Sequence, residues 1–134
     1  MTFFFDNHHS PELVALLRQR GVDAVHLRDQ FSDRGLDDVE WIPQIAARGW
    51  ILVTGDHRLR SRRGEKPVFR QARLITFFLE AGFTNKTRRV QIEWMLRQWP
   101  AITALAATVQ PGDCFLVPHK GKIRKQETGP AAPD

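Results

Sequence analysis

Short, uniformly apolar segments recur along this 134-residue chain and alternate with segments of helical periodicity. The clearest one, residues 50–54 (WILVT), runs directly into Gly55 and Asp56, and residues 2–6 (TFFFD) end in Asp6. Apolar runs of this length are typical of strands that are buried on both faces. Strands that alternate with helices predict an α/β fold with a central, mostly parallel sheet flanked by helices.

The other elements are expected from caps, stops and periodicity. Ser10 and Pro11 form a helix start and Gly21 a stop. Further strands are predicted at 22–27, 73–79 and 114–117, and further helices at 36–48, 67–72 and 85–109. Because proline removes a backbone hydrogen bond, Pro43 is expected to delay or kink its helix and Pro100 to break or bend the last one. Residues 1–127 should form one domain, and 128–134 a disordered tail.

Composition narrows the classes of protein. A single cysteine, Cys114, excludes an internal disulfide framework and suits a reducing cytosol. The apolar N-terminus lacks a basic region and stops at Asp6, so neither a signal peptide nor a membrane span is expected. We therefore expect a cytoplasmic protein that does not enter a membrane.

Three aspartates are predicted to meet at one edge of the sheet. Asp6 and Asp56 follow strands, and Asp38 lies near the start of a helix that leaves another strand. All strands of a parallel sheet end at the same edge, where ligands bind. Gathered carboxylates are hard oxygen ligands suited to Mg²⁺ or Mn²⁺, and such a site can hydrolyse phosphate esters. Asp37 and Glu40 are alternatives to Asp38, because residues 37–40 also resemble a capping box; Asp6 and Asp56 could also be turn residues.

Basic residues follow the third aspartate immediately. They are compatible with a polyanionic partner or with a solvated loop. If the partner is a nucleic acid, the residues predicted to contact its backbone are Arg58, Arg60, Arg62, Arg63 and Lys66. A second basic run spans 120–125. Three histidines lie near Asp6 and Asp56 in the sequence: His8, His9 and His57. They are candidates for metal ligands, a general base or polar residues at the rim of the site.

The pattern resembles the PIN domain family, which includes VapC-type toxin ribonucleases. The resemblance is carried by residues 3–7 (FFFDN) with the following SPEL, by 25–29 (VHLRD), by 38–40 (DVE) and by 51–56 (ILVTGD), within residues 2–83. It implies a PIN-like three-layer fold and a Mg²⁺- or Mn²⁺-dependent endoribonuclease, the toxin of a type II toxin–antitoxin pair. The implied partners are RNA, a cognate antitoxin protein and a second copy of the chain.

The resemblance also assigns roles to residues. Asp6, Asp38 and Asp56 match the catalytic, metal-binding acids, and supporting positions fall on Asn7, Thr54 and Glu40. Many PIN domains carry a further acid past the third aspartate, where this chain has Leu59 and Arg60, so Asp113 is considered as a substitute. Two alternatives remain: a catalytically degenerate RNA-binding or antitoxin-binding module, and a phosphoacceptor domain that uses Asp56.

Overall fold

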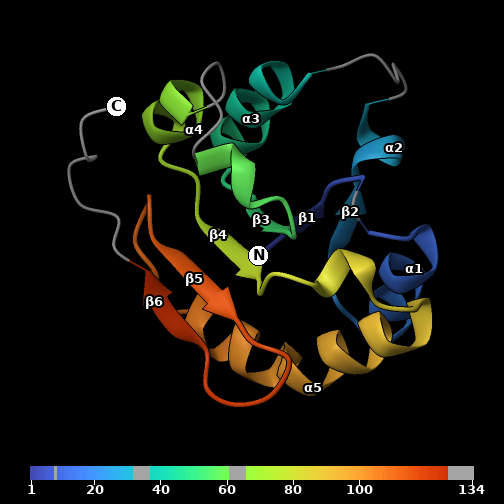
Figure 1. Cartoon of the computed structure of the whole chain (residues 1–134). Coiled ribbons are helices and arrows are strands. Elements are labelled where there is room, and N and C mark those ends of the chain that lie inside the picture. Colours follow the sequence, from blue (N-terminus) through green and yellow to red (C-terminus); the bar gives the residue numbers. More distant parts are fainter. Residues whose placement is uncertain (8, 32–36, 61–65, 127–134) are drawn as a thin grey trace.

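The computed structural model describes residues 1–7, 9–31, 37–60 and 66–126. The strands are β1 (Phe3–Phe5), β2 (Ala24–His26), β3 (Ile51–Thr54), β4 (Thr76–Leu79), β5 (Cys114–Val117) and β6 (Arg124–Gln126). The α-helices are α1 (Pro11–Gln19), α2 (Leu27–Gln30), α3 (Asp38–Ala47), α4 (Lys66–Ala72) and α5 (Arg88–Ala106). Two 3-10 turns, η1 (His57–Arg60) and η2 (Phe83–Asn85), complete the described elements (Figure 1).

The strands form one sheet in the order β2-β1-β3-β4-β5-β6. Strands β1 to β5 pair in parallel and β6 pairs antiparallel with β5. In the register, Phe5 lies beside both His26 and Val53, and Leu79 lies beside Val117. The ends of β1 to β5 therefore share one edge of the sheet, as the predicted mostly parallel fold requires.

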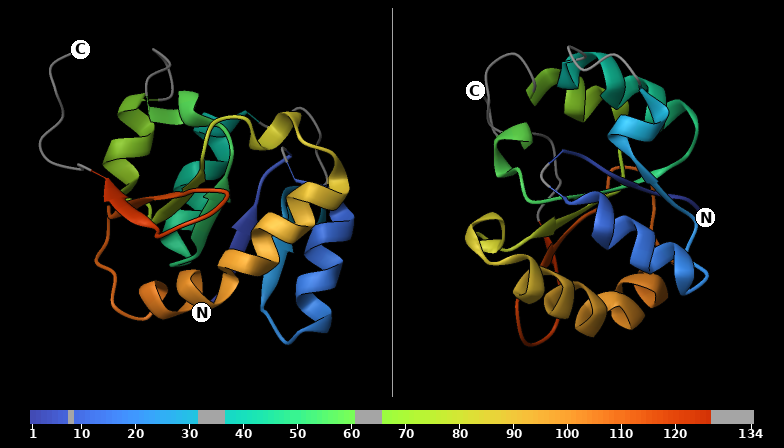
Figure 2. Two further views of the ribbon diagram at one scale, coloured as in Figure 1. Left: turned by 60° about the horizontal axis from the view of Figure 1, so that its bottom comes forward. Right: turned by 90° about the vertical axis from the view of Figure 1, so that its right-hand side faces the viewer.

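Both faces of the sheet are covered by helices, which confirms the predicted three layers. Alternate residues of one strand point to opposite faces, so Phe5 packs in a core with α1 and α5, while Phe4 packs in a second core with α3 and α4. The right-hand view of Figure 2 shows the strands between these two pairs of helices. Every residue of β1, β3 and β4 is buried.

Local signals explain where the first helix begins and ends. The hydroxyl of Ser10 accepts a hydrogen bond from the backbone N–H of Leu13 at 3.2 Å, and Pro11 takes the first helical position. Gly21 then adopts a φ of +86°, which favours glycine, and the chain turns into β2. Helix α1 thus forms where the sequence predicts it.

The prolines do not interrupt the helices as expected. Helix α3 begins at Asp38 in spite of Pro43, and α5 continues from Arg88 to Ala106 through Pro100, so the predicted delay and the predicted break are wrong. The alternative outcomes, a kink at Pro43 and a bend at Pro100, stay predictions. Ile42 and Ile45 of α3 are fully buried, as is Ile102 of α5. Packing of these apolar side chains outweighs one lost hydrogen bond, since most helical stability in proteins comes from tertiary contacts.

One α-helix and one strand were not predicted. Helix α2 starts directly after β2, where the chain was expected to remain a strand to Leu27, and β6 returns beside β5 as an edge strand. The burial of β6 is low, with Arg124 and Lys125 exposed, so it lacks the apolar pattern that revealed the other strands. None of the described helices has both the length and the apolar character needed to cross a bilayer.

Candidate functional site

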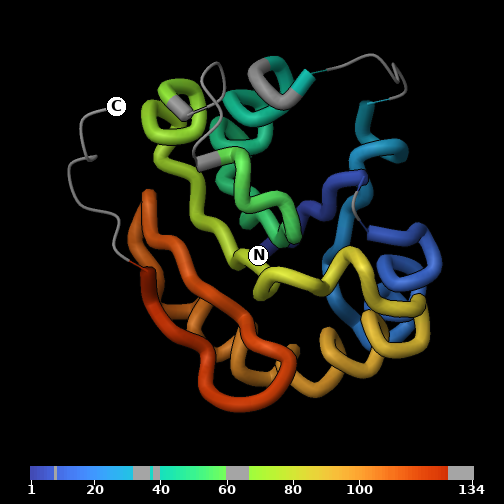
Figure 3. The backbone as a smooth tube through the Cα atoms, in the orientation of Figure 1, coloured from blue at the N-terminus to red at the C-terminus, as the bar shows by residue number. Residues whose placement is uncertain are grey.

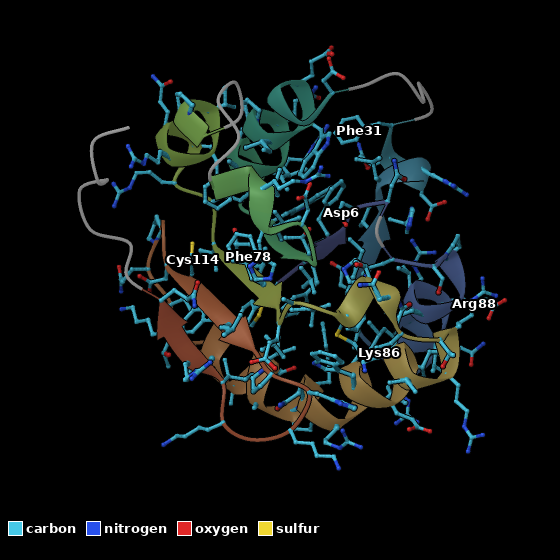
Figure 4. All side chains as sticks on the ribbon, in the orientation of Figure 1. Asp6, Phe31, Phe78, Lys86, Arg88 and Cys114 are labelled. Atoms are coloured by element: carbon cyan, nitrogen blue, oxygen red, sulfur yellow. The ribbon has the colours of Figure 1, made fainter. Side chains whose placement is uncertain are left out.

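Asp6 and Asp56 occupy the shared edge of the sheet. Asp6 is the residue after β1, and Asp56 follows β3 with only Gly55 between them. Although both are acids, Asp6 is 5% exposed and Asp56 is 7% exposed. Figure 4 shows Asp6 at the end of β1, enclosed by the surrounding elements. Burial of carboxylates at this edge is costly unless they are hydrogen-bonded or bind a cation.

Thr54 joins the two aspartates through its hydroxyl group. The hydroxyl donates a hydrogen bond to Oδ2 of Asp6, and its oxygen accepts one from the backbone N–H of Asp56 at 3.0 Å. Thr54 is the last residue of β3 and is fully buried. One hydroxyl, held by a rigid strand, therefore fixes the two acids relative to each other.

Arg58 contacts the outer side of this pair. Oδ1 of Asp56 accepts hydrogen bonds from the backbone N–H of Arg58 at 3.0 Å and from its Nε at 3.1 Å. The arginine side chain is 65% exposed whereas the Asp56 side chain is 7% exposed. A cation that is open to solvent thus reaches a buried acid of the site.

A pair of buried histidines anchors the turn that follows Asp6. The backbone N–H of His9 donates to the Asp6 carbonyl at 3.1 Å, and the Nε2 of His9 donates to the Val53 carbonyl at 3.1 Å. His26 receives a hydrogen bond from the backbone N–H of Arg28 on Nδ1 at 3.1 Å, so its proton is on Nε2, which donates to the His9 carbonyl at 2.9 Å. These bonds connect the turn to β3 and β2.

The roles of the histidines were not predictable from the sequence. His9 was considered as a ligand, a base or a rim residue, yet its ring is 2% exposed and contacts Phe5 and Phe83. His26 was missed; a polar residue within an apolar strand was the available signal. His57 donates through Nε2 to the Leu79 carbonyl at 2.6 Å, so its ring is held against β4. His8 lies outside the described residues.

The second predicted acid is at the start of α3. Asp38 is the first residue of this helix, but its side chain, like those of Arg60 and Lys66, is not among the described ones. Glu40 accepts a hydrogen bond from the backbone N–H of Asp37 at 3.2 Å, the geometry of a capping box. The Glu40 carboxylate is therefore engaged in starting the helix.

Two further acids lie next to strands of the sheet. Asp113 precedes β5, at the opposite edge from Asp6 and Asp56, and pairs with Lys125 at 3.5 Å. The suggestion that Asp113 replaces a missing acid is therefore wrong, because strand direction places it at the far end. Glu80 follows β4 at the site edge and was missed, although an acid directly after an apolar strand is the signal that identified Asp6.

The donor set fits a hard divalent cation. Asp6 and Asp56 supply carboxylate oxygens, and Mg²⁺ is commonly held by one or two carboxylates while it retains several waters. Within the described part of the chain, no group of three or more histidine, cysteine, aspartate or glutamate side chains gathers as a metal site. Asp6 and Asp56 are the pair that could hold the ion.

The connection between β4 and α5 borders the site on another side. A Cβ atom added to Gly55 would lie 3.0 Å from the Thr84 methyl group, so this connection packs closely on the backbone between Thr54 and Asp56. Figure 3 shows its path from the end of β4 towards α1 and the start of α5. Lys86 and Arg88 mark that start in Figure 4, and Arg88 forms an ion pair with Glu12 of α1 at 2.8 Å.

The remaining predicted site residues are placed only in part. Asn7 is exposed in the turn after Asp6, and the backbones of Arg60 and Lys66 belong to η1 and α4. Arg62 and Arg63 lie outside the described residues. Of the predicted RNA-binding residues, the side chain of Arg58 alone can be described, and it contacts Asp56.

Comparison with known proteins agrees with this architecture. A family model described as a PIN like domain matches residues 1–81, which contain β1 to β4 and both buried aspartates. No curated protein and no solved structure matches the chain. Since the matched segment is more than half of the sequence, this chain belongs to the PIN-like domain family.

Proposed function

We propose that this protein is a Mg²⁺-dependent endoribonuclease. The observation that carries the proposal is the buried pair of Asp6 and Asp56, held together by the Thr54 hydroxyl at the edge where α/β proteins bind ligands. Mn²⁺ is a suitable replacement because it also prefers oxygen ligands. Asp38 is proposed as the third acid, since it begins α3.

Each residue of the site has a task in this proposal. Asp6 and Asp56 would hold the ion, which when bound supplies Lewis acidity toward water and phosphate oxygens. Thr54 fixes the Asp6 carboxylate relative to the backbone of Asp56. The buried surroundings exclude bulk water, which strengthens electrostatic interactions. Arg58 would contact the RNA backbone together with the basic residues that follow it: Arg60, Arg62, Arg63 and Lys66.

The test is cleavage of RNA by purified wild-type, Asp6→Asn and Asp56→Asn proteins in Mg²⁺ and in EDTA. The wild type should cut RNA only with the metal, and each variant should lose about 100-fold or more in rate, because even partners of metal ligands are worth 10- to 100-fold. Asp23→Asn is the matched control, since Asp23 is exposed and precedes β2 at the opposite edge. Equal cleavage by wild type and Asp6→Asn would disprove the proposal.

We further propose that the chain is the toxin of a type II toxin–antitoxin pair, with a cognate protein as its antitoxin. The same substitution tests this role in cells. Induced expression of the wild type should arrest bacterial growth, whereas Asp6→Asn should not. Growth arrest that persists in Asp6→Asn would separate toxicity from the acidic site.

A non-catalytic RNA-binding module is the second candidate. It is favoured by the fact that, in the described ranges, no group of three or more acids gathers at the site and Asp56 bonds to Arg58. That module would bind RNA in EDTA and leave it uncut in Mg²⁺. The cleavage experiment therefore distinguishes the two candidates directly.

A further inference from the structure

The turn between β5 and β6, residues 118–123, has a buried base and a charged tip. Pro118 and Ile123 at its two ends are buried, whereas Lys120 and Lys122 are exposed on either side of Gly121. Gly121 adopts a φ of +100°, which favours glycine and lets the chain reverse. Its basic residues have no part in the proposed catalytic site.

The direction of β5 places this turn at the edge of the sheet that carries the acids. β5 runs parallel to β4, and through β3 to β1, so its end lies on the same side as Asp6 and Asp56. One strand, β4, separates β5 from β3. Neighbouring strands are about 4.8 Å apart, so the two strand axes are roughly 10 Å apart.

The turn is fixed to α5 by polar contacts. The side-chain amide of the buried Gln98 donates to the Pro118 carbonyl at 2.8 Å and to the Gly121 carbonyl at 2.9 Å. Arg97 donates to the His119 carbonyl at 3.1 Å, and the His119 ring stacks on a tryptophan of α5 with centroids 4.6 Å apart. A tip held in this way is preorganised, which lowers the entropic cost of binding.

The charges on the tip are not balanced by nearby acids. Arg124 pairs with Glu80 at 3.9 Å and Lys125 with Asp113 at 3.5 Å. Lys120 and Lys122, in contrast, form no ion pair with any described residue. Residues 114–126 contain no acid at all. The turn thus presents two positive charges, unpaired among the described residues, at the same edge of the sheet as the acids but away from them.

We propose that this turn is a second anchor for the phosphate backbone of a single RNA strand, which runs along the sheet edge from Arg58 to Lys120 and Lys122. The proposal rests on the proposed function, because it extends the path of the same substrate beyond the acids. Lysines contact phosphates as point charges, so the anchor positions the strand and reads no sequence.

The test measures binding of a single-stranded RNA of about 20 nucleotides by fluorescence anisotropy in EDTA at several salt concentrations. Each phosphate contact on a single strand contributes about −0.7 to the slope of log K against log salt. Lys120→Gln/Lys122→Gln should therefore weaken binding and flatten the slope by about 1.4. The control is Arg20→Gln/Arg73→Gln, which removes two exposed charges that precede β2 and β4 at the opposite edge.

The outcomes separate this proposal from the proposed function. An unchanged slope in the lysine variant, or an equal loss in the arginine control, would overturn the second anchor. Both outcomes are measured as RNA binding in EDTA, without metal or cleavage. They therefore decide the second anchor even if the wild type does not cut RNA. If it does cut, the lysine variant should cleave a dinucleotide at the wild-type rate, while its cleavage of the long RNA slows. Impaired cleavage of the dinucleotide would contradict an anchor distant from the acids.

Discussion

Among single residues, Thr54 treats the two aspartates differently, because its hydroxyl donates a hydrogen bond to one and accepts a hydrogen bond from the other. Its O–H donates a hydrogen bond to the Asp6 carboxylate, and its oxygen accepts a hydrogen bond from the backbone N–H of Asp56. Neither of these two hydrogen bonds brings a positive charge to a carboxylate, because the hydroxyl and the amide are both uncharged. Among the described residues, Arg58 brings a positive charge to the pair through Oδ1 of Asp56. A divalent ion at the site would therefore meet a positive neighbour.

Arg58 should consequently have opposite effects on metal binding and on catalysis. Arg58→Gln should tighten Mn²⁺ binding by up to roughly fivefold, since an ion pair whose cation is open to solvent is worth about 0–1 kcal/mol. It should also slow RNA cleavage, because in the proposed function Arg58 contacts the RNA backbone. The carboxylate keeps its orientation, because the backbone N–H of Arg58 also holds Oδ1 of Asp56.

Isothermal titration with Mn²⁺ measures the first effect and an RNA cleavage assay the second. Arg58→Lys is the control that retains the charge but not the planar group, and it should leave Mn²⁺ affinity near that of the wild type. Weaker Mn²⁺ binding in Arg58→Gln would show that the guanidinium supports the metal site and does not compete with it.

At the scale of elements, the sequence identified what depends on local pattern. The apolar runs located β1 and β3, whose ends carry Asp6 and Asp56, and the Ser10 cap located α1. The ordering of strands in space, β2-β1-β3-β4-β5-β6, has no such local signal. The helices that contain Pro43 and Pro100 were predicted, but their continuity through proline was not, because tertiary packing decides it. The edge strand β6 was missed because pairing with β5 decides it.

The candidate site was also predictable only where it depends on local sequence pattern. The positions of Asp6 and Asp56 followed from strand direction, whereas the contacts that hold them did not. Thr54 was expected near the acids because of the family resemblance, but the anchoring by His9 and His26 links three strands that lie far apart in the sequence. Hydrogen bonds between distant segments leave no pattern in a single sequence.

Gln98 offers a test of how strongly an element depends on one buried polar side chain. Gln98→Leu leaves the Pro118 and Gly121 carbonyls without their donor, so the free energy of unfolding should fall by about 1–3 kcal/mol. Gln44→Leu on α3 is the matched control; its amide bonds the Glu40 carbonyl within the same helix and is exposed, so its effect should stay within about 0.5 kcal/mol. Urea denaturation measures both, and equal losses would contradict a special role for Gln98.

At the scale of the whole molecule, one sheet connects two cores. Phe5 contributes to the core with α1 and α5, and Phe4 to the core with α3 and α4. Asp6 directly follows the end of their strand, β1. Any interaction that holds the strand ends together therefore acts on both cores, and a metal ion that binds the folded protein should stabilise the chain as a unit.

This coupling predicts that added metal raises the thermal stability of the protein. The prediction does not depend on whether the protein cleaves RNA. An ion present at 100 times its dissociation constant adds about 2.7 kcal/mol to the free energy of unfolding, which corresponds to roughly 10 °C in Tm for a chain of this length. Mn²⁺ should raise the Tm of the wild type and of Asp23→Asn alike, and raise that of Asp6→Asn and Asp56→Asn much less. Differential scanning calorimetry provides the measurement. A rise of the same size in all four proteins would place the ion away from Asp6 and Asp56, and no rise in any of them would favour the RNA-binding module, because that protein needs no metal.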